Sequence, residues 1–281
     1  MVWIVLLGLV AALLLWSLAT PMLRRVWVFS LHALKYLLIL AADRLRLRRL
    51  WGRLRGRPTE RLTGPVALRL FCEDMGPTFI KFGQIVASSA GMFPERYTAE
   101  FQKVLDRVRP FSFEEVRAIV DEELGEERGQ RLEEIDPVPL AAASIAQVHA
   151  AELSDGTRVV LKVQRPGIQK RIAADIRVMH LVARVAARLF PRRTEFMNPV
   201  GFVEDFAATL REEIDFRLEA RNLDRFNEIT RELGYADVRA PVPHWDLTTG
   251  RLLVMERFAG TRVDDVAGIA ARGLDGEAML I

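Results

Sequence analysis

Residues 139–164 carry the residue types of a phosphate-binding hairpin. Lys162 lies near the end of the apolar run VVLKVQ, which follows a tight turn, SDGT, at 154–157. Upstream, PLAAAS places three alanines in another turn. A lysine that ends a strand beside a hairpin turn can hold the phosphates of a nucleotide, although glycines rather than alanines usually line such a turn. The alternative for Lys162 is a lysine that only water surrounds.

A run of carboxylates, REEIDFRLEAR at 211–221, could supply a partner for that lysine. In a straight helix each residue turns by about 100°, which puts Glu212, Asp215 and Glu219 on one stripe. Glu213 lies off that stripe. The same run could instead form a charged face in water, so the spacing leaves the partner of the lysine open.

The elements that must position these side chains fall into two groups. Residues 61–125 show apolar positions at three- and four-residue spacing, which predicts helices, and Ser112 with Glu115 forms a capping-box pattern. The predicted helices of this group cover 65–75, 77–90, 94–108 and 112–125. The predicted strands that follow cover 135–140, 145–153, 158–164, 238–249 and 251–258, with helices at 168–190 and 198–234 after the third strand.

Composition excludes some classes of protein. The chain has 281 residues and is 50% hydrophobic, so it can bury a sizeable core. Its single cysteine, Cys72, rules out an internal disulfide framework and a cysteine-rich zinc site, and we expect it to pack inside a helix. The histidines have no partners at metal-ligand spacing.

The first 23 residues contain no charged side chain, and about 20 apolar residues suffice to cross a bilayer. They predict a transmembrane helix, and Arg24-Arg25 place the rest of the chain in the cytoplasm. A cleaved signal peptide ending near Ser17-Leu18-Ala19 is the alternative. A second apolar segment, 26–42, could cross as a hairpin or lie in the membrane interface.

An arginine-rich stretch follows at 43–60, with seven arginines and two acids, Asp43 and Glu60. Next to an apolar segment, such a cluster is typical of attraction to anionic lipid headgroups. A nucleic-acid surface is the rival interpretation, but no reading fold or stacking aromatic residues accompany the arginines. We therefore expect membrane lipids and no nucleic acid as partners.

Four segments carry a family resemblance. FIKFGQ at 79–84, PLAAASIAQVH at 139–149, VVLKVQRPG at 159–167 and EIDFRLEARN at 213–222 resemble the signature set of the UbiB/AarF family of atypical protein-kinase-like proteins, which support ubiquinone biosynthesis. The resemblance covers about residues 61–265. Three strands, a lysine, a helix with carboxylates and two more strands are also the order of parts in a protein-kinase small lobe. The expected fold class is therefore α+β, with a kinase-like small lobe of five antiparallel strands behind a helical extension.

The resemblance implies a set of site residues. It implies a nucleotide loop that has alanines in place of glycines, made of Ala141, Ala142, Ala143 and Ser144. It implies a phosphate-binding lysine with a helix glutamate, Lys162 with Glu219. It implies a K-x-G-Q motif in the extension and an acidic E-x-D motif that faces it, which here are Lys81, Gln84, Glu213 and Asp215. Glu256 falls at the hinge between lobes, where its backbone would meet the adenine.

These residues imply ATP as cofactor and an activity of ATP hydrolysis or phosphorylation of a small or lipid-like target. Alanine reaches fewer loop conformations than glycine, which would make the loop selective. Mg²⁺ is expected too, with ligands in a large lobe that should follow, so the 281-residue chain alone is expected to be inactive. A non-catalytic membrane scaffold and a conventional protein kinase are the alternatives.

The expected organisation follows the chain. The predicted parts are a membrane anchor at 1–42, a basic juxtamembrane stretch at 43–60, a helical extension at 61–132, the small lobe at 133–260 and the start of a large lobe at 261–281. Expected partners are prenyl-quinone intermediates or quinone-biosynthesis proteins, and a homodimer stays open. The expected location is the bacterial inner membrane, with the soluble part in the cytoplasm.

Overall fold

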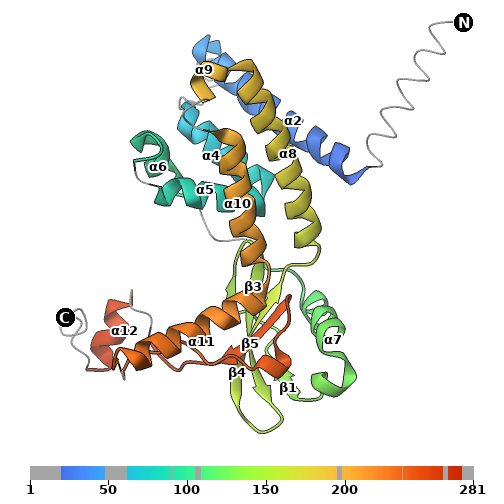
Figure 1. The fold of residues 1–281 in the computed structure, drawn as a ribbon, viewed down its shortest axis with the longest axis vertical. Coiled ribbons are helices and arrows are strands. Elements are labelled where there is room, and N and C mark those ends of the chain that lie inside the picture. The colour runs from blue at the N-terminus through green and yellow to red at the C-terminus, as the bar shows by residue number, and fades with distance from the viewer. Residues whose placement is uncertain are drawn as a thin grey trace, which may run out of the picture.

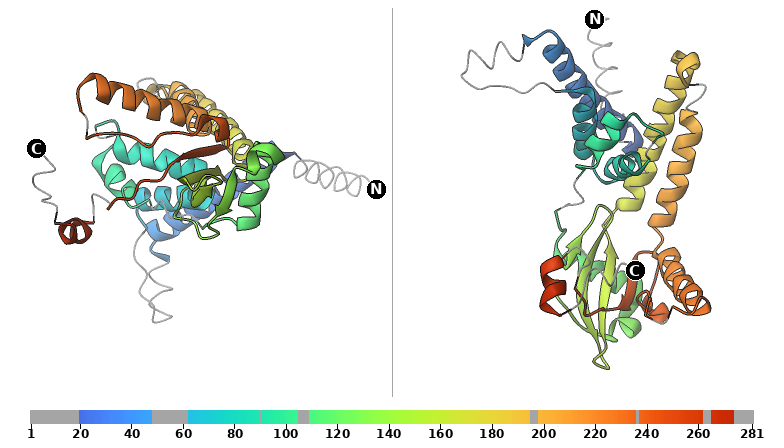
Figure 2. Two further views of the ribbon diagram at one scale, coloured as in Figure 1. Left: turned by 90° about the horizontal axis from the view of Figure 1, so that it is seen from below. Right: turned by 90° about the vertical axis from the view of Figure 1, so that its left-hand side faces the viewer.

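The computed structural model describes residues 20–47, 62–89, 91–104, 109–194, 198–235, 237–261 and 265–273. The molecule is elongated, with helices at one end and a sheet at the other (Figures 1 and 2). The helical end contains α2 (Pro21–Arg44), α4 (Gly64–Met75), α5 (Pro77–Ser88), α6 (Glu95–Phe101), α8 (Ile168–Leu189), α9 (Pro191–Thr194) and α10 (Pro199–Glu213). The sheet end contains α7 (Phe113–Gly129), β1 (Leu132–Ile135), β2 (Ala141–Ala142), β3 (Ala146–Leu153), β4 (Arg158–Gln164), α11 (Phe216–Glu232), η1 (Trp245–Leu247), β5 (Leu252–Glu256) and α12 (Val266–Ala271). The predicted α+β class is confirmed.

The sheet has five antiparallel strands in the order β1-β3-β4-β5, with β2 paired to β3. Successive side chains of a strand point to opposite faces. Leu161 and Val163 of β4 belong to the core beneath α7, as does Val254 of β5. Leu253 packs with Phe216 of α11 on the other face. Lys162, between Leu161 and Val163, therefore lies on the α11 face of the sheet.

Helix α7 begins at the predicted capping box. The Ser112 side chain accepts a hydrogen bond from the Glu115 backbone N–H, and the Glu115 carboxylate accepts one from the Ser112 backbone N–H. The helix was predicted to end at Gly125, but it continues to Gly129 beyond a kink at Gly125, where φ is 66°. Residues of α7 pack on one face of the sheet, opposite the face on which Lys162 lies.

The helices that precede the strands in the sequence and those that follow β4 share one hydrophobic core. Residues of α4 and α5 pack with those of α8 and α10. The Phe71 ring meets the rings of Phe29 and Phe79 edge-on, with centroids 5.3 Å and 5.8 Å away. A Cβ atom on Gly83 would lie 2.7 Å from the Phe101 ring, so glycine in the K-x-G-Q motif allows α5 and α6 to approach closely.

A buried carboxylate ties this core together. The Asp175 side chain of α8 is fully buried and forms an ion pair with Arg25 of α2. It also accepts a hydrogen bond of 2.6 Å from the Thr78 hydroxyl of α5. A buried charge that loses its partner is strongly destabilising. Asp175 therefore fixes α2 and α5 against α8.

Four predicted elements need correction. The predicted strand 238–249 instead contains η1 and a single bridge between Pro243 and Met255, because its prolines lack the N–H of a strand ladder. The predicted strand 135–140 is wrong as well: β1 ends at Ile135, and two prolines separate it from β2. Within the described residues, the predicted helix 94–108 ends at Phe101. The predicted helix 198–234 divides into α10 and α11.

The described residues cover only part of the segments predicted at the N-terminus. The predicted transmembrane helix lies outside the described residues except for its last positions, and so does most of the stretch 43–60. The second apolar segment forms α2, which packs against α4 and α8 and buries Tyr36 and Asp43. Among the described helices, the segment Met22–Arg44 is long and apolar enough to cross a membrane by length and composition alone.

Candidate functional site

Lys162 meets Glu219 on the α11 face of the sheet. Its ammonium donates to both carboxylate oxygens of Glu219, at 2.7 Å and 2.6 Å. The same ammonium lies 5.0 Å from the centre of the Phe216 ring, a cation–π distance. The two side chains are 23% and 36% exposed, so solvent still reaches them. Of the carboxylates that the sequence left open, Glu219 is the one beside Lys162, at a place where a phosphate group could also approach.

The alanine segment forms the hairpin next to this pair. Ala141 and Ala142 form β2 and pair with Val148 and Gln147 of β3. The Ala143 N–H donates to the Ala146 carbonyl at 2.8 Å, which closes the turn, and Ser144 is buried. None of the residues 141–144 has a positive φ. The turn is therefore built from conformations that alanine favours, as the alanine-for-glycine replacement predicts.

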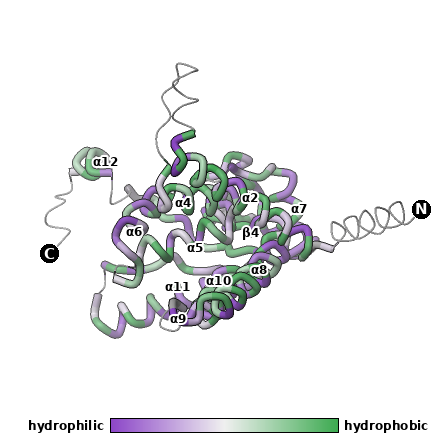
Figure 3. Tube along the Cα trace, turned by 90° about the horizontal axis from the view of Figure 1, so that it is seen from above, coloured by the Kyte–Doolittle hydropathy of each residue, from purple (hydrophilic) through white to green (hydrophobic). Residues whose placement is uncertain are grey.

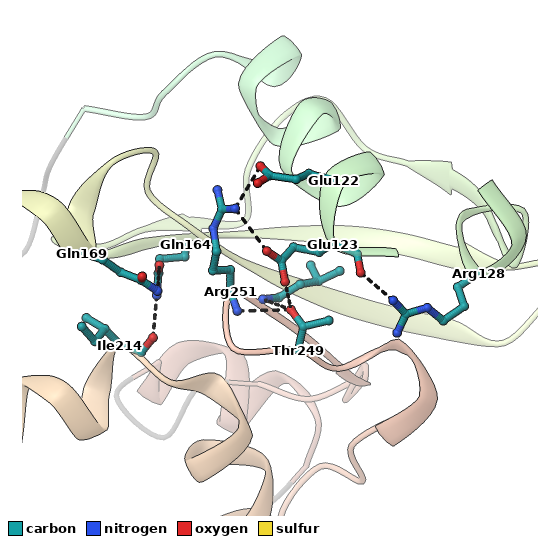
Figure 4. A network of polar contacts seen from close by, with 9 residues as sticks. Glu122, Glu123, Arg128, Gln164, Gln169, Ile214, Thr249 and Arg251 are labelled. Carbon is teal, nitrogen blue, oxygen red and sulfur yellow. Dashed lines mark hydrogen bonds and ion pairs between the residues drawn. The ribbon is translucent and has the colours of Figure 1, made fainter. Parts of the chain in front are cut away.

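Helices α10 and α11 meet at a joint, residues 213–216, that separates Glu213 from Glu219. The Gln164 side chain donates to the Ile214 carbonyl at 2.7 Å and accepts from Gln169 (Figure 4). Asp215 begins α11 as its N-cap and accepts a hydrogen bond from the Arg217 backbone N–H. Since Gln164 holds the carbonyl that a continuous helix would use, the chain turns at Ile214. The straight-helix stripe in the sequence therefore does not exist in the structure.

The extension reaches this joint through α5. Lys81 forms an ion pair with Glu213, the last residue of α10, and the two side chains are 27% and 29% exposed. Gln84 lies one turn further along α5 and is half-buried. The E-x-D motif thus splits in function: Glu213 meets the extension lysine, while Asp215 caps α11.

Glu256 ends β5, at the edge of the site. Its carboxylate accepts hydrogen bonds from both terminal nitrogens of Arg239, at 2.5 Å and 2.8 Å, and these bonds lower the pKa of Glu256. Its backbone N–H donates to the Val242 carbonyl. The side chain is engaged within the protein, so a contact of this residue with an adenine ring stays a prediction.

Several functional side chains escaped the sequence analysis. Gln164 was not singled out, although a glutamine at the end of an apolar strand could have indicated a buried hydrogen bond. Gln147 and His149 form a second buried group: the His149 Nδ1–H donates to the Asp136 carbonyl, and Gln147 bonds to His149. Gln147 also exchanges two hydrogen bonds with the Phe111 backbone. These bonds fix the segment that leads from the extension to α7.

The opposite side of the sheet carries a separate polar network. Arg251 forms ion pairs with Glu122 and Glu123 of α7, and Thr249 bonds to Glu123 (Figure 4). It ties α7 to the loop before β5 and does not reach Lys162. Among the described residues, no three His, Cys, Asp or Glu side chains lie close enough together to hold a metal ion.

Comparison with known proteins gives consistent matches. An uncharacterised protein of Mycobacterium tuberculosis is 44% identical over 207 residues, 72% of this chain and 41% of its own length. A probable protein kinase UbiB of Pseudomonas putida is 39% identical over 233 residues, 82% of this chain and 42% of its own. A chloroplastic aarF domain-containing protein kinase of Arabidopsis thaliana is 39% identical over 210 residues, 74% and 39%. The chain thus spans about two fifths of the length of these relatives.

A solved structure of Rv3197 with erythromycin, from Mycobacterium tuberculosis, is 24% identical, with a TM-score of 0.47, and the match covers 74% of this chain and 51% of that one. The profile of the ABC1 atypical kinase-like domain matches residues 103–280, well over half of the chain and all of the sheet end. This match and the UbiB and aarF relatives confirm the resemblance seen in the motifs. The chain belongs to the ABC1 atypical kinase-like family.

Proposed function

We propose that this chain forms the nucleotide-binding part of a membrane-attached atypical kinase or ATPase of the UbiB type, which supports ubiquinone biosynthesis. The observation that carries the proposal is the Lys162–Glu219 pair on the α11 face of the sheet, beside the alanine hairpin. An ammonium held by a carboxylate at this place is how kinase-like proteins fix a nucleotide's phosphates.

The residues present fit ATP but do not assign a metal site. Lys162 would contact phosphate oxygens, Glu219 would orient its ammonium, and the hairpin backbone at 141–144 would line the phosphates. ATP would supply the phosphoryl group. Among the described residues, no cluster of carboxylates is placed to hold Mg²⁺.

The Lys81–Glu213 pair supports a non-protein target. It brings the extension against the end of α10, next to the helix that carries Glu219. A helix held there would stand in the way of an extended peptide, while a small or lipid-like molecule needs less room. We therefore propose prenyl-quinone intermediates or their biosynthetic proteins as partners.

Membrane attachment is supported by the outer face of α2. On the packed face of α2, Arg25 forms an ion pair with Asp175. The side chains of Trp27, Leu31, Leu34 and Leu38 are exposed. These four positions follow one another at helical spacing, and Arg24 and Arg44 flank them. An apolar stripe with basic ends is typical of a helix that lies in the membrane interface. We propose that α2 lies against the cytoplasmic surface of the membrane rather than crossing it.

Titration of ATP by calorimetry tests the nucleotide site, using the complete natural protein and its Lys162→Met variant. We expect binding in the natural protein and at least about tenfold weaker binding in the variant, roughly 1.4 kcal/mol. Lys170→Met, an exposed lysine on α8, is the control and should bind like the natural protein. Equal affinity in all three proteins would contradict the proposed role of Lys162 and favour a scaffold.

Sedimentation with vesicles tests the attachment. The double variant Leu34→Asp, Leu38→Asp should lose binding to vesicles that contain anionic lipid. Leu233→Asp changes a leucine that is 65% exposed at the sheet end and should keep it. Undiminished binding of the double variant would remove the α2 face from the proposal.

A further inference from the structure

A cavity of about 670 Å³ lies inside the helical end, between α2, α4, α5, α8 and α10. Its walls are apolar, and the rings and chains that form them include Phe29, Phe71, Phe79, Phe82, Met179 and Ala183. The volume falls within the range of about 300–1,000 Å³ that is usual for small-molecule sites. The cavity is separate from the Lys162 site, whose residues do not line it.

The lining favours an uncharged occupant. Two lining residues are ionisable, Cys72 and Asp205. Burial raises the pKa of the Cys72 thiol to about 12, so this group is neutral at physiological pH. Asp205 is an exposed acid, and no lysine or arginine is among the lining residues. A carboxylate or phosphate would thus find no counter-charge, whereas hydrocarbon would meet aromatic and methionine side chains.

The rim of the cavity continues into an apolar outer surface. Leu68, Met92 and Val182 line the cavity and are 39%, 68% and 42% exposed. On α8, Val182 lies beside Leu181 and Val185, which are also exposed. Figure 3, which looks onto the helical end, shows hydrophobic and hydrophilic residues mixed along its helices. These exposed apolar side chains at the rim would favour the approach of a chain that partitions into membranes over that of a polar metabolite.

The cavity is mechanically connected to the second lysine–glutamate pair. Lys81 lies in α5 between two wall residues, Phe79 and Phe82. The Phe82 ring packs edge-on against Phe206 of α10, with centroids 5.8 Å apart. Glu213 ends the same α10. An occupant that moves α5 away from the end of α10 would therefore also move Lys81 away from Glu213.

We propose that this cavity binds the hydrocarbon chain of a neutral lipid-like molecule, of the isoprenoid type, and that its occupation loosens the Lys81–Glu213 contact. The binding of a neutral hydrocarbon chain stands on the cavity, and the isoprenoid type rests on the proposed function. The consequence for nucleotide binding rests on the proposed function.

Displacement of a fluorescent apolar probe tests the binding step. The complete protein is loaded with N-phenyl-1-naphthylamine in detergent-free buffer and titrated with geranylgeraniol, a neutral isoprenoid alcohol. We expect saturable displacement. Ala186→Trp places an indole into the cavity and should weaken geranylgeraniol binding by about tenfold or more. Ala187→Trp, at the next position of α8 but outside the lining, is the matched control and should bind like the natural protein.

Failure of displacement in the natural protein would overturn the proposal. So would equal binding by Ala186→Trp, because the probe would then report an outer surface. If Ala186→Trp unfolds, Phe82→Leu enlarges the cavity instead and must change the affinity for geranylgeraniol.

Calorimetry with ATP tests the coupling. Saturating geranylgeraniol should change the ATP affinity of the natural protein by about threefold or more, and ATP should change the geranylgeraniol affinity by the same factor. Lys81→Met should abolish this coupling and keep the displacement of the probe. Unchanged ATP affinity would overturn the coupling. A protein that never binds ATP would overturn the proposed function, while the probe experiment would still decide the cavity.

Discussion

The two lysine–glutamate pairs belong to different regions and are held in different ways. Lys162 and Glu219 both lie at the sheet end, and the lysine reaches two carboxylate oxygens and an aromatic ring. Lys81 and Glu213 join an extension helix to the end of α10. Solvent exposure is similar for the two pairs. The difference is one of connectivity: the first pair is fixed within one packed unit, and the second changes whenever α5 moves.

The largest expected effect comes from removing Asp175, the buried carboxylate that holds α5 and therefore Lys81 in place. Asp175→Ala leaves Arg25 without its carboxylate and Thr78 without its acceptor, and should destabilise the protein by about 3–5 kcal/mol. Urea unfolding measures the loss. Hydrogen exchange should quicken in α5 more than in α11, because Asp175 supports the helical end.

Asp121→Ala, an exposed acid on α7, is the control and should cost no more than about 0.5 kcal/mol. A loss for Asp175→Ala no greater than this control would contradict the structural role of the buried carboxylate.

A second test breaks the first pair. Glu219→Gln leaves the Lys162 ammonium without its bidentate partner, so ATP binding by the complete protein should weaken about tenfold, near 1.4 kcal/mol. Calorimetry measures it. Glu228→Gln removes another carboxylate of α11, which pairs with Arg225, and should have no effect. Identical affinities of the two variants would show that the pair does not orient the lysine.

A third test measures the second pair directly. A double-mutant cycle of Lys81→Met and Glu213→Gln should give a coupling energy of about 0.5 kcal/mol, as for other partly exposed pairs. The neighbouring Glu212→Gln supplies the control cycle with Lys81→Met and should give no coupling. Equal coupling in both cycles would mean that the lysine senses general charge rather than Glu213.

The smallest test concerns Glu100 and its two basic partners, all of which lie within the extension. Hydrogen bonds from Lys103 and Arg69 lower the pKa of Glu100 in the folded protein. A carboxyl group with a lowered folded pKa stabilises the fold above its unfolded pKa, about 4.3, and loses this effect as the pH falls through the folded value.

Glu100→Gln should therefore cost about 0.3 kcal/mol near neutral pH and almost nothing in acid below the lowered pKa. Thermal unfolding at several pH values checks this. A cost that stayed constant into acid would mean that the charge of Glu100 is not involved.

Local patterns predicted the elements that depend on local chemistry. The capping box at Ser112 and the turn before β4 follow from side chains a few residues apart. The joint at Ile214 could not be predicted in this way. The sequence EIDF contains no glycine or proline, and the break is made by Gln164, fifty residues away in the chain. Sequence spacing alone left four carboxylates as partners of Lys162, and the family motifs implied Glu219, whose place beside the lysine follows from that joint.

The cavity could not be predicted from sequence patterns either. Phe79 and Phe82 read as core positions of an amphipathic helix, and only the packing of several helices decides whether such a core is filled. The packing role of Cys72 was predicted correctly, since it is buried in α4.

The joint at Ile214 makes α10 a lever. With 15 residues, the helix is about 22 Å long, so a tilt of about 5° at the joint would move its beginning by roughly 2 Å. Glu213 lies at the pivot and would scarcely be displaced. A tilt of α10 alone would therefore leave the Lys81–Glu213 contact in place, and an occupant of the cavity loosens that contact by moving α5. In any rearrangement of the helical end, the moving member of the second pair is then Lys81.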